Sequence, residues 1–316
     1  TIYEVPLHLH EEGLDDRIVE MLHLNAQRGD LSVWETIVKR VKQPLKNVTI
    51  ALVGKYVDLK ESYKSLCEAL THGGIANDAK VSLRWVDSEE IEAKGAEVML
   101  KGMDGILVPG GFGIRGVEGK IAAVKYAREN KIPYFGICLG MQCAVIETAR
   151  SLAGLAGANS SEFDAQTPHP VIYLIEQWYD HRTGTVQMRD ITSDKGGSMR
   201  LGAYPCTLKE GSLAASIYGT NTISERHRHR WEFNNKYLSQ YEKAGMMASG
   251  KNPGTGLVEI IELTGHPFFI GVQYHPELKS TVERPQPIFV HFVKAARAYA
   301  DKKTGMRNPL LQSEMI

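Results

Sequence analysis

Hydrophobic positions follow two alternating patterns along most of this chain. Short apolar runs, typical of strands buried on both faces, are separated by longer segments whose apolar residues recur at helical spacing. The runs predict strands at 48–53, 81–86, 105–108, 134–138, 258–263 and 268–274, and the longer segments predict helices at 63–70, 119–130, 141–149 and 287–299. Because strands alternate with helices, we predict an α/β fold with a central, mostly parallel sheet flanked by helices.

The pattern changes near both ends and in the second half of the chain. Helical spacing at 15–24 and 31–41 leads into a basic, proline-containing stretch, 39–46, that is typical of a linker. After Asn159, short segments punctuated by glycine predict an antiparallel insertion with strands at 171–175, 185–189 and 199–204. We therefore expect a linker region at 1–46, a main domain at 47–300 and a flexible tail at 301–316. The first residue is Thr1 rather than Met, so we expect a piece of a longer protein.

Composition narrows the possible partners and location. Lys plus Arg and Asp plus Glu each number 37, so the net charge is zero, and neither nucleic acid nor an anionic membrane is expected as the main partner. The charge-free stretch 132–146 contains proline and glycine and is shorter than the roughly 20 apolar residues of a bilayer span. The start lacks a secretory pattern and the four cysteines form no CxxC pair. These features predict a reduced, cytoplasmic protein.

The strongest chemical motif is Gly136-Ile137-Cys138-Leu139-Gly140, at the end of the predicted strand 134–138. It has the form of a nucleophile elbow with Cys in place of Ser. A strand that turns sharply into a helix leaves no room for Cβ atoms beside the nucleophile, which explains the glycines. The turn would place the sulfur at a helix N-terminus, where the thiolate is favoured over the thiol. A buried structural cysteine in a glycine turn would give the same short pattern.

A second motif, His275-Pro276-Glu277, follows the predicted strand 268–274. Residues two apart in an extended segment point to the same side, so His275 and Glu277 can converge on one site. There the carboxylate would orient the imidazole that takes a proton from Cys138. Alone the motif would be typical of a surface turn. Its position at a strand end, downstream of the cysteine motif, favours a catalytic triad.

The glycine-rich segment 109–116 follows the predicted strand 105–108. Gly111, Gly113 and Gly116 match the G-x-G-x-x-G pattern of dinucleotide-binding loops. Pro109 interrupts the turn, however, and the strand is not the first of its unit. We favour a loop whose backbone N–H groups face a developing negative charge, with the N–H groups of Gly111 and Leu139 as the oxyanion donors.

The charged segment 225–231 is predicted to be a strand with alternating faces. One face would direct basic groups toward a substrate carboxylate, and a solvated charged edge is the default alternative. Its two histidines could suggest a metal site, but no second ligand cluster has zinc-like spacing, so we predict no metal. Neutral net charge also argues against a nucleic-acid surface here.

Three strings, PGGFG, GICLGMQ and QYHPE, in that order, resemble the class I glutamine amidotransferases. The longer strings LVGKY, YKS, LVPGGFG-RG-EGK, ANSSEF, MRLG and ERHRHR resemble in particular the C-terminal domain of the CTP synthase family. The opening TIYEVP resembles the end of that family's synthase domain, followed by the interdomain linker. The resemblance covers about residues 1–300.

The resemblance implies roles for individual residues. Cys138, His275 and Glu277 match a triad that hydrolyses the side-chain amide of L-glutamine through a thioester and releases ammonia. Lys64, Phe112 and Arg189 match positions linked to a GTP effector. The positions that match residues holding glutamine are Gly111, Leu139, Gly140, Met141, Gln142, Glu162 and Arg230.

The resemblance also implies partners outside this chain. Ammonia would pass to the protein's own synthase domain, which phosphorylates UTP with ATP and Mg²⁺ and aminates it to CTP in a homotetramer. No cofactor is expected in the present segment. The alternatives are the amidotransferase domain of another glutamine-dependent synthase, a nucleotide-binding module that uses the Gly111–Gly116 loop, and a catalytically silent regulatory domain.

Overall fold

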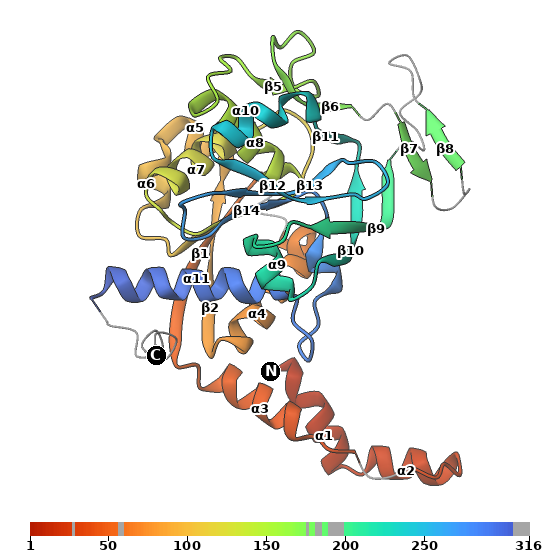
Figure 1. Cartoon of the computed structure of the whole chain (residues 1–316). Helices are drawn as coiled ribbons and strands as arrows, with labels where there is room; N and C mark the ends of the chain where they lie inside the picture. The colour runs from red at the N-terminus through yellow and green to blue at the C-terminus, as the bar shows by residue number, and fades with distance from the viewer. Residues whose placement is uncertain (27–28, 56–59, 175–176, 181–184, 189–198, 306–316) are drawn as a thin grey trace.

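The computed structural model describes residues 1–26, 29–55, 60–174, 177–180, 185–188 and 199–305. At its centre lies a nine-stranded sheet (Figure 1). Its parallel half consists, in spatial order, of β2 (Ala79–Asp87), β1 (Lys46–Gly54), β3 (Gly105–Val108), β4 (Tyr134–Ile137) and β14 (Phe269–Val272). The antiparallel half continues with β13 (Val258–Leu263), β12 (Met246–Lys251), β9 (Arg200–Leu208) and β10 (Thr222–His229). The predicted fold class is confirmed.

Helices cover both faces of this sheet because successive residues of a buried strand point in opposite directions. One face packs Ile50 and Leu52 against helices that contribute Leu70 and Phe289. The helices on this face are α4 (Lys64–Ala76), α9 (Leu213–Tyr218) and α11 (Pro287–Lys303). The other face is covered by α5 (Ser88–Lys94), α6 (Ala96–Leu100), α7 (Val117–Glu129), α8 (Leu139–Ser151) and α10 (Leu238–Lys243).

The segment after Asn159 differs from the predicted separate insertion. Only part of it forms small sheets, and the strands β9 and β10 extend the central sheet instead. The small sheets combine β5 (Asn159–Ser160), β6 (Pro170–Leu174) and β11 (Trp231–Phe233), and pair β7 (Gln177–Asp180) with β8 (Thr185–Met188). A single residue, Arg230, separates β10 from β11. The chain therefore passes from the central sheet to a small sheet at this point.

An N-terminal arm, defined here as Ile2–Lys42, lies to one side of the body (Figure 1). It consists of η1 (Ile2–Glu4), α1 (Val5–Glu11), α2 (Leu14–Met21) and α3 (Ser32–Lys42). Tyr3, Ile37 and Val38 of the arm form a small core with Ile75 of α4. The predicted linker 39–46 is mostly regular structure, because α3 continues to Lys42 and β1 begins at Lys46.

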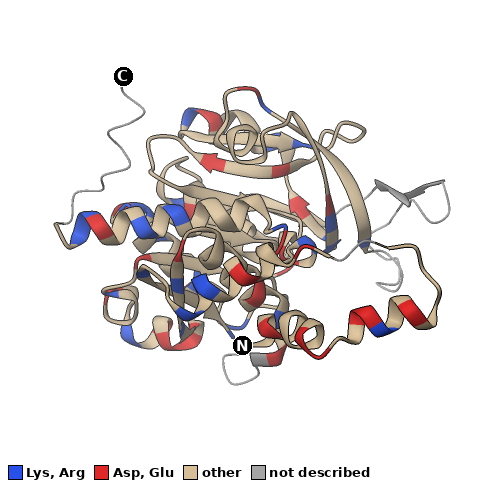
Figure 2. Cartoon of the chain, turned by 90° about the horizontal axis from the view of Figure 1, so that it is seen from below, with Lys and Arg blue, Asp and Glu red and all other residues tan. Residues whose placement is uncertain are grey.

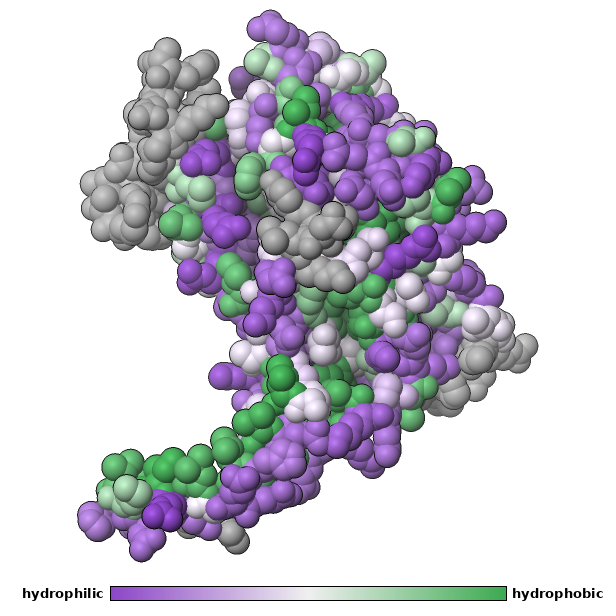
Figure 3. All heavy atoms as spheres, turned by 180° about the vertical axis from the view of Figure 1, so that it is seen from behind, coloured by the Kyte–Doolittle hydropathy of each residue, from purple (hydrophilic) through white to green (hydrophobic). Residues whose placement is uncertain are grey.

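The arm exposes many apolar side chains, which form a continuous stripe in Figure 3. These are Ile2, Val5, Leu9, Leu14, Ile18, Met21, Leu22, Leu24 and Val33. Acidic residues predominate over α1 and α2, whereas both signs of charge are mixed along α11 (Figure 2). An exposed apolar surface of this kind marks an interaction site in soluble proteins.

The C-terminal helix extends into the predicted tail. Helix α11 runs to Lys303, and buried Asp301 accepts a hydrogen bond from Lys46 Nζ at 2.9 Å. Residues 301–303 are therefore ordered by helix packing, while 306–316 lie outside the described residues. Among the helices of the described part of the chain, none is long and apolar enough to cross a membrane.

Candidate active site

Cys138 stands at the junction of β4 and α8. It is the residue that precedes the helix, and its backbone has φ 52° and ψ −103°. Its N–H donates a hydrogen bond to the carbonyl oxygen of Val272 in β14 at 2.7 Å, which fixes the turn to the neighbouring strand. Positive φ is costly for a residue with a Cβ atom and is concentrated at functional sites. The backbone therefore presents this side chain at the start of a helix.

Both glycines of the motif are required by the packing around this turn. A Cβ atom on Gly136 would lie 2.6 Å from the carbonyl carbon of Gly140. One on Gly140 would lie 2.0 Å from the carbonyl oxygen of Val108 in β3. The prediction that the elbow has no room for Cβ atoms is confirmed. These close approaches let α8 start directly above the strand ends.

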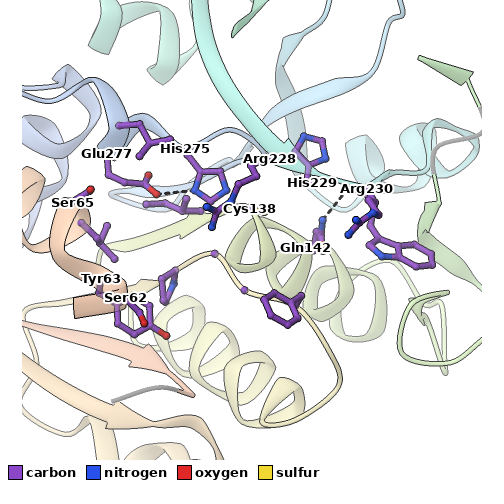
Figure 4. A pocket seen from close by; sticks show the side chains of 18 of the residues that line it. Ser62, Tyr63, Ser65, Cys138, Gln142, Arg228, His229, Arg230, His275 and Glu277 are labelled. Carbon is purple, nitrogen blue, oxygen red and sulfur yellow. Dashed lines mark hydrogen bonds and ion pairs between the residues drawn. The ribbon is translucent and has the colours of Figure 1, made fainter. Parts of the chain in front are cut away.

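His275 and Glu277 follow β14, the strand next to β4. The His275 N–H donates to the carbonyl oxygen of Arg226 at 2.8 Å, and Nδ1 of His275 lies 2.7 Å from Oε1 of Glu277. Figure 4 shows the imidazole beside Cys138, with the carboxylate on its far side. A Cβ atom on Gly110 would lie 2.7 Å from Cε1 of His275 and 3.5 Å from Cβ of Cys138. The glycine loop therefore contacts both side chains at once.

Electrostatics around His275 favour its protonated form. Burial alone lowers the pKa of His275, but the neighbouring Cys138 and Glu277, whose Oε1 is hydrogen-bonded to Nδ1, outweigh burial and raise this pKa to about 10. At neutral pH the imidazole therefore holds its proton between a sulfur and a carboxylate. Such a pair is the arrangement that an activated cysteine nucleophile needs.

These residues share a cavity of about 590 Å³. The triad lines it together with four of the residues predicted to hold glutamine, namely Gly111, Gln142, Glu162 and Arg230. The cavity is also lined by Gly110, Arg228, His229 and Trp231, which belong to the two segments that the sequence singled out at 109–116 and 225–231. The sequence assigned no role to six further lining residues: Ser62, Tyr63, Ser65, Leu66, Met199 and Leu278. Its size suits a small polar metabolite.

Of the other predicted residues that the structure describes, Phe112 lines this cavity and the rest lie around it. The side chains of Leu139 and Met141 are buried in the first turn of α8 with Gly140, and none of the three lines the cavity. Their relevant groups are the first N–H groups of α8, which a helix leaves without intrahelical partners. Phe112 lines the cavity and is 68% exposed, whereas Lys64 is exposed beside it. Arg189 lies outside the described residues.

Two polar side chains on the cavity wall are held by hydrogen bonds, and a third, Arg230, has a donor available. The Gln142 Nε2 group donates to the carbonyl oxygen of Trp231 at 3.0 Å, and Glu162 Oε1 accepts from the N–H of Gly113 at 3.0 Å (Figure 4 shows Gln142). The Nε atom of Arg230 is buried and has no hydrogen-bond partner among the described residues. An unpaired guanidinium donor beside a cavity is available to a carboxylate ligand.

The segment 225–231, predicted as one strand with alternating faces, is divided at Arg230 between β10 and β11. Glu225, His227 and His229 of β10 are buried, while Arg226 and Arg228 are exposed, and Arg228 lines the cavity. No group of three or more potential metal-binding side chains occurs in the part of the chain that the structure describes. The buried histidines instead contact Glu232 and Glu259, and Arg200 pairs with the same two glutamates. No local sequence signal revealed this connection.

Comparisons with known proteins agree with this geometry. Residues 58–295 match the family model described as glutamine amidotransferase class-I. CTP synthases of Nitratidesulfovibrio vulgaris and Oleidesulfovibrio alaskensis are each 56% identical to this chain, over 95% and 96% of its length, respectively. The chain spans about half the length of these curated relatives, 54% and 55%.

A solved structure extends the likeness to three dimensions. The glutaminase domain of Trypanosoma brucei CTPS, determined with bound acivicin, is 39% identical to this chain and superposes with a TM-score of 0.70. The match covers 79% of this chain and 94% of that domain. Sequence, fold and site therefore agree on one family.

Proposed function

We propose a function from the premise that this chain belongs to the class I glutamine amidotransferase family. The chain hydrolyses L-glutamine to glutamate and ammonia, with Cys138 as the nucleophile and His275 and Glu277 as its activating pair. The observation that carries the proposal is the meeting of a strained cysteine and a buried His–Glu pair in one cavity. Three residues from two adjacent strand ends rarely converge in this way without a catalytic reason.

The reaction follows from the positions of these groups. The Cys138 thiolate attacks the amide carbon, and the resulting oxyanion accepts hydrogen bonds from the N–H groups of Gly111 and Leu139. The tetrahedral adduct collapses as protonated His275 donates its proton to the departing nitrogen, which leaves ammonia and a thioester. His275 then takes a proton from water, which attacks the thioester and releases glutamate.

The cavity wall supplies the groups that a free amino acid requires. Arg230 suits the substrate carboxylate because its guanidinium has a buried donor without a partner among the described residues. Glu162 suits the ammonium group, and Gln142 is oriented toward the cavity by its bond to Trp231. Leu139, Gly140 and Met141 act through the backbone of the first helical turn. In this proposal glutamine lies across the start of α8.

Replacing the nucleophile tests this function. Cys138→Ala should lower glutaminase turnover to about one thousandth or less of the original, because the covalent route is removed. Cys143→Ala is the matched control, since that buried thiol lies one turn further along α8 and burial raises its pKa to about 12. Glutamate release is the measurement. Equal turnover in Cys138→Ala and the original chain would overturn the proposal.

We further propose that the ammonia serves a larger enzyme. In the longer protein it would aminate UTP to CTP, because the relatives carry the name CTP synthase. The synthase domain would use ATP and Mg²⁺ for this step. The exposed apolar stripe of the N-terminal arm supports a junction with that domain, because such a stripe is expected to be covered. Exposed Phe112 at the cavity and neighbouring Lys64 would then belong, with Arg189, to a GTP effector site.

A further inference from the structure

Five buried ionisable side chains form a closed ring behind the active site. They are Arg200 of β9, His227 and His229 of β10, Glu232 of β11 and Glu259 of β13, and we call them the buried ring. All five are almost completely withdrawn from solvent. Charged groups are costly to bury, so a cluster of this size requires an account of its charges and protons.

Each member of the buried ring contacts the next. Arg200 holds Glu232 Oε1 at 3.1 Å with one terminal nitrogen and Glu259 Oε1 at 2.6 Å with the other. His229 Nδ1 lies 3.5 Å from Glu232 Oε1, and His227 Nε2 lies 3.1 Å from Glu259 Oε2. The two imidazoles close the ring through His229 Nε2 and His227 Nδ1, which are 2.8 Å apart.

The charges of the buried ring require one proton beyond those of two neutral imidazoles. Arg200 carries one positive charge, and it pairs with both Glu232 and Glu259, which would carry two negative charges if both were ionised. A net negative charge is costly in a cluster that is almost completely withdrawn from solvent. Each neutral imidazole holds one proton, and the contact of 2.8 Å between the two imidazoles is a hydrogen bond, whereas the two histidine–glutamate contacts are close approaches without hydrogen-bond geometry. A third proton, on a carboxyl group or on an imidazole, cancels the one negative charge left after Arg200 has balanced one glutamate.

We propose that the buried ring holds this third proton at neutral pH, is electrically neutral, and positions the cavity wall Arg228–Trp231 for glutamine. The inference rests on the proposed function for the identity of the substrate. The ring residues are positioning residues, because they act through the wall rather than on the reacting atoms. Arg200 binds both carboxyl groups, so either glutamate can carry this proton while the other balances the guanidinium.

The connection from ring to wall is direct. His229 belongs to the ring and also lines the cavity, and Glu232 lies two residues after Arg230. Arg200 joins Glu232 of the small sheet to Glu259 of the central sheet, so it fixes both sides of the crossing at Arg230. Trp231, between these residues, accepts the hydrogen bond that orients Gln142. We therefore expect that opening the ring displaces the cavity residues His229, Arg230 and Trp231 together.

The surroundings place the third proton on a carboxyl group. Burial, opposed by Arg200 and assisted by Glu259, raises the pKa of Glu232 to about 8, and burial likewise raises the pKa of Glu259. Burial, with Arg200 and His275 nearby, holds the pKa of both His227 and His229 well below its usual value. Tyr173 of β6 is the cross-strand neighbour of Glu232. Arg200 and protonated His275 are the two cations near the imidazoles, and both disfavour an imidazolium in the ring.

Glutamine replacements test the proton count. Glu232→Gln mimics a neutral carboxyl group and should keep the KM for glutamine within about twofold at pH 7, and Glu259→Gln should do the same. Glu232→Ala should raise KM about tenfold or more with a smaller change in kcat, because it removes the contact altogether. The double variant Glu232→Gln/Glu259→Gln leaves Arg200 without a counter-charge and should lose far more than the two single variants combined.

Two comparisons make the outcome decisive. Glu147→Gln, at a buried glutamate that pairs with Arg128 on α8, is the control for loss of any buried carboxylate. Above pH 8 the original chain should lose glutamine affinity as the third proton dissociates, and Glu232→Gln should not. Additive losses in the two single variants, or the same loss in Glu232→Gln as in Glu232→Ala, would overturn the proposal.

A readout without glutamine separates this inference from the proposed function. Infrared spectra of the original chain at pH 7 should contain the band of a buried protonated carboxyl group, and the double glutamine variant should lack it. If the band is present and glutamine is not hydrolysed, the proposed function fails while the ring stands. If hydrolysis occurs without the band, the ring proposal fails alone.

Discussion

Two histidine–glutamate pairs in this molecule behave in opposite ways. His275 lies 2.7 Å from Glu277, and His227 lies 3.1 Å from Glu259. All four residues are shielded from solvent to a large extent. Yet the pKa of His275 is raised to about 10, whereas that of His227 is held well below its usual value.

The remaining neighbours explain the difference. Cys138 adds a second attractive partner to His275, and together with Glu277 it outweighs the effect of burial. Burial is the largest cause of the low pKa of His227. Glu259 is already engaged by Arg200, so its charge is shared and does not offset burial, and the same arginine lowers this pKa further. A carboxylate beside an imidazole therefore does not define a catalytic pair. The charge of the next group outward decides between a reactive and a structural role.

The largest effect should come from removing the charge of the reactive pair. Glu277→Gln keeps the shape of the side chain but removes the attraction for protonated His275, so glutaminase kcat should fall between about 10²- and 10⁴-fold. The pKa of His275, followed by NMR, should fall well below about 10. Glu283→Gln, at an exposed position, is the control. An unchanged His275 titration would contradict the role given to Glu277.

A smaller effect should come from crowding the same imidazole. Gly110→Ala places a methyl group 2.7 Å from Cε1 of His275 and should displace the ring from Cys138. We expect kcat to fall about 10- to 100-fold, because misplacement by about 1 Å costs that much, with little change in melting temperature. Gly254→Ala, whose new methyl group would meet only Asn252 Oδ1 at 3.5 Å, is the control. Equal activity of both variants would show that the loop does not constrain His275.

The smallest effect concerns the buried ring, to which His227 and Glu259 belong, and the pH dependence of stability. Glu232 has a pKa of about 8 in the folded chain, against 4.5 as its ordinary value, so between these values the folded state binds an additional proton. The free energy of unfolding should therefore decrease as pH rises from about 4.5 to 8, and Glu232→Gln should lack this contribution. The raised pKa of His275 causes a similar decrease from about 6.5 to 10 in both proteins and cancels in their difference. Urea unfolding at several pH values measures the difference in the free energy of unfolding between the two proteins. A difference that stays constant with pH would contradict the raised pKa of Glu232.

Cys138 and the reactive pair, His275 and Glu277, could be predicted from the sequence because their geometry is local. The glycines at 136 and 140 surround Cys138 within one turn, and the two-residue spacing of His275 and Glu277 follows from an extended backbone. The parallel strands were predictable for a similar reason, since a strand buried on both faces is a continuous apolar run. Several bounds, such as β3 and β13, agree residue for residue with the predicted runs.

The buried ring could not be predicted from the sequence, because its geometry depends on how distant strands pair. Segments at 199–204 and 225–231 were predicted as strands, but nothing local shows that Arg200 stands opposite His229 in the β9–β10 pairing. Glu232 and Glu259 come from two further strands in different sheets. A sequence motif contains residues that are neighbours along the chain, whereas the members of this ring are brought together by the pairing of separate strands.

The buried ring has a consequence for how this protein can change over evolutionary time. Replacing a member by a side chain that cannot keep its contacts leaves two partners with unmet hydrogen-bonding or charge requirements. Apart from the exchange of one glutamate for glutamine, a single substitution is therefore penalised even when the new residue would suit a complete exchange. The five positions should thus drift as a unit, or not at all. The cavity wall Arg228–Trp231 should therefore also change slowly, although most of the constraint comes from side chains that do not contact the substrate.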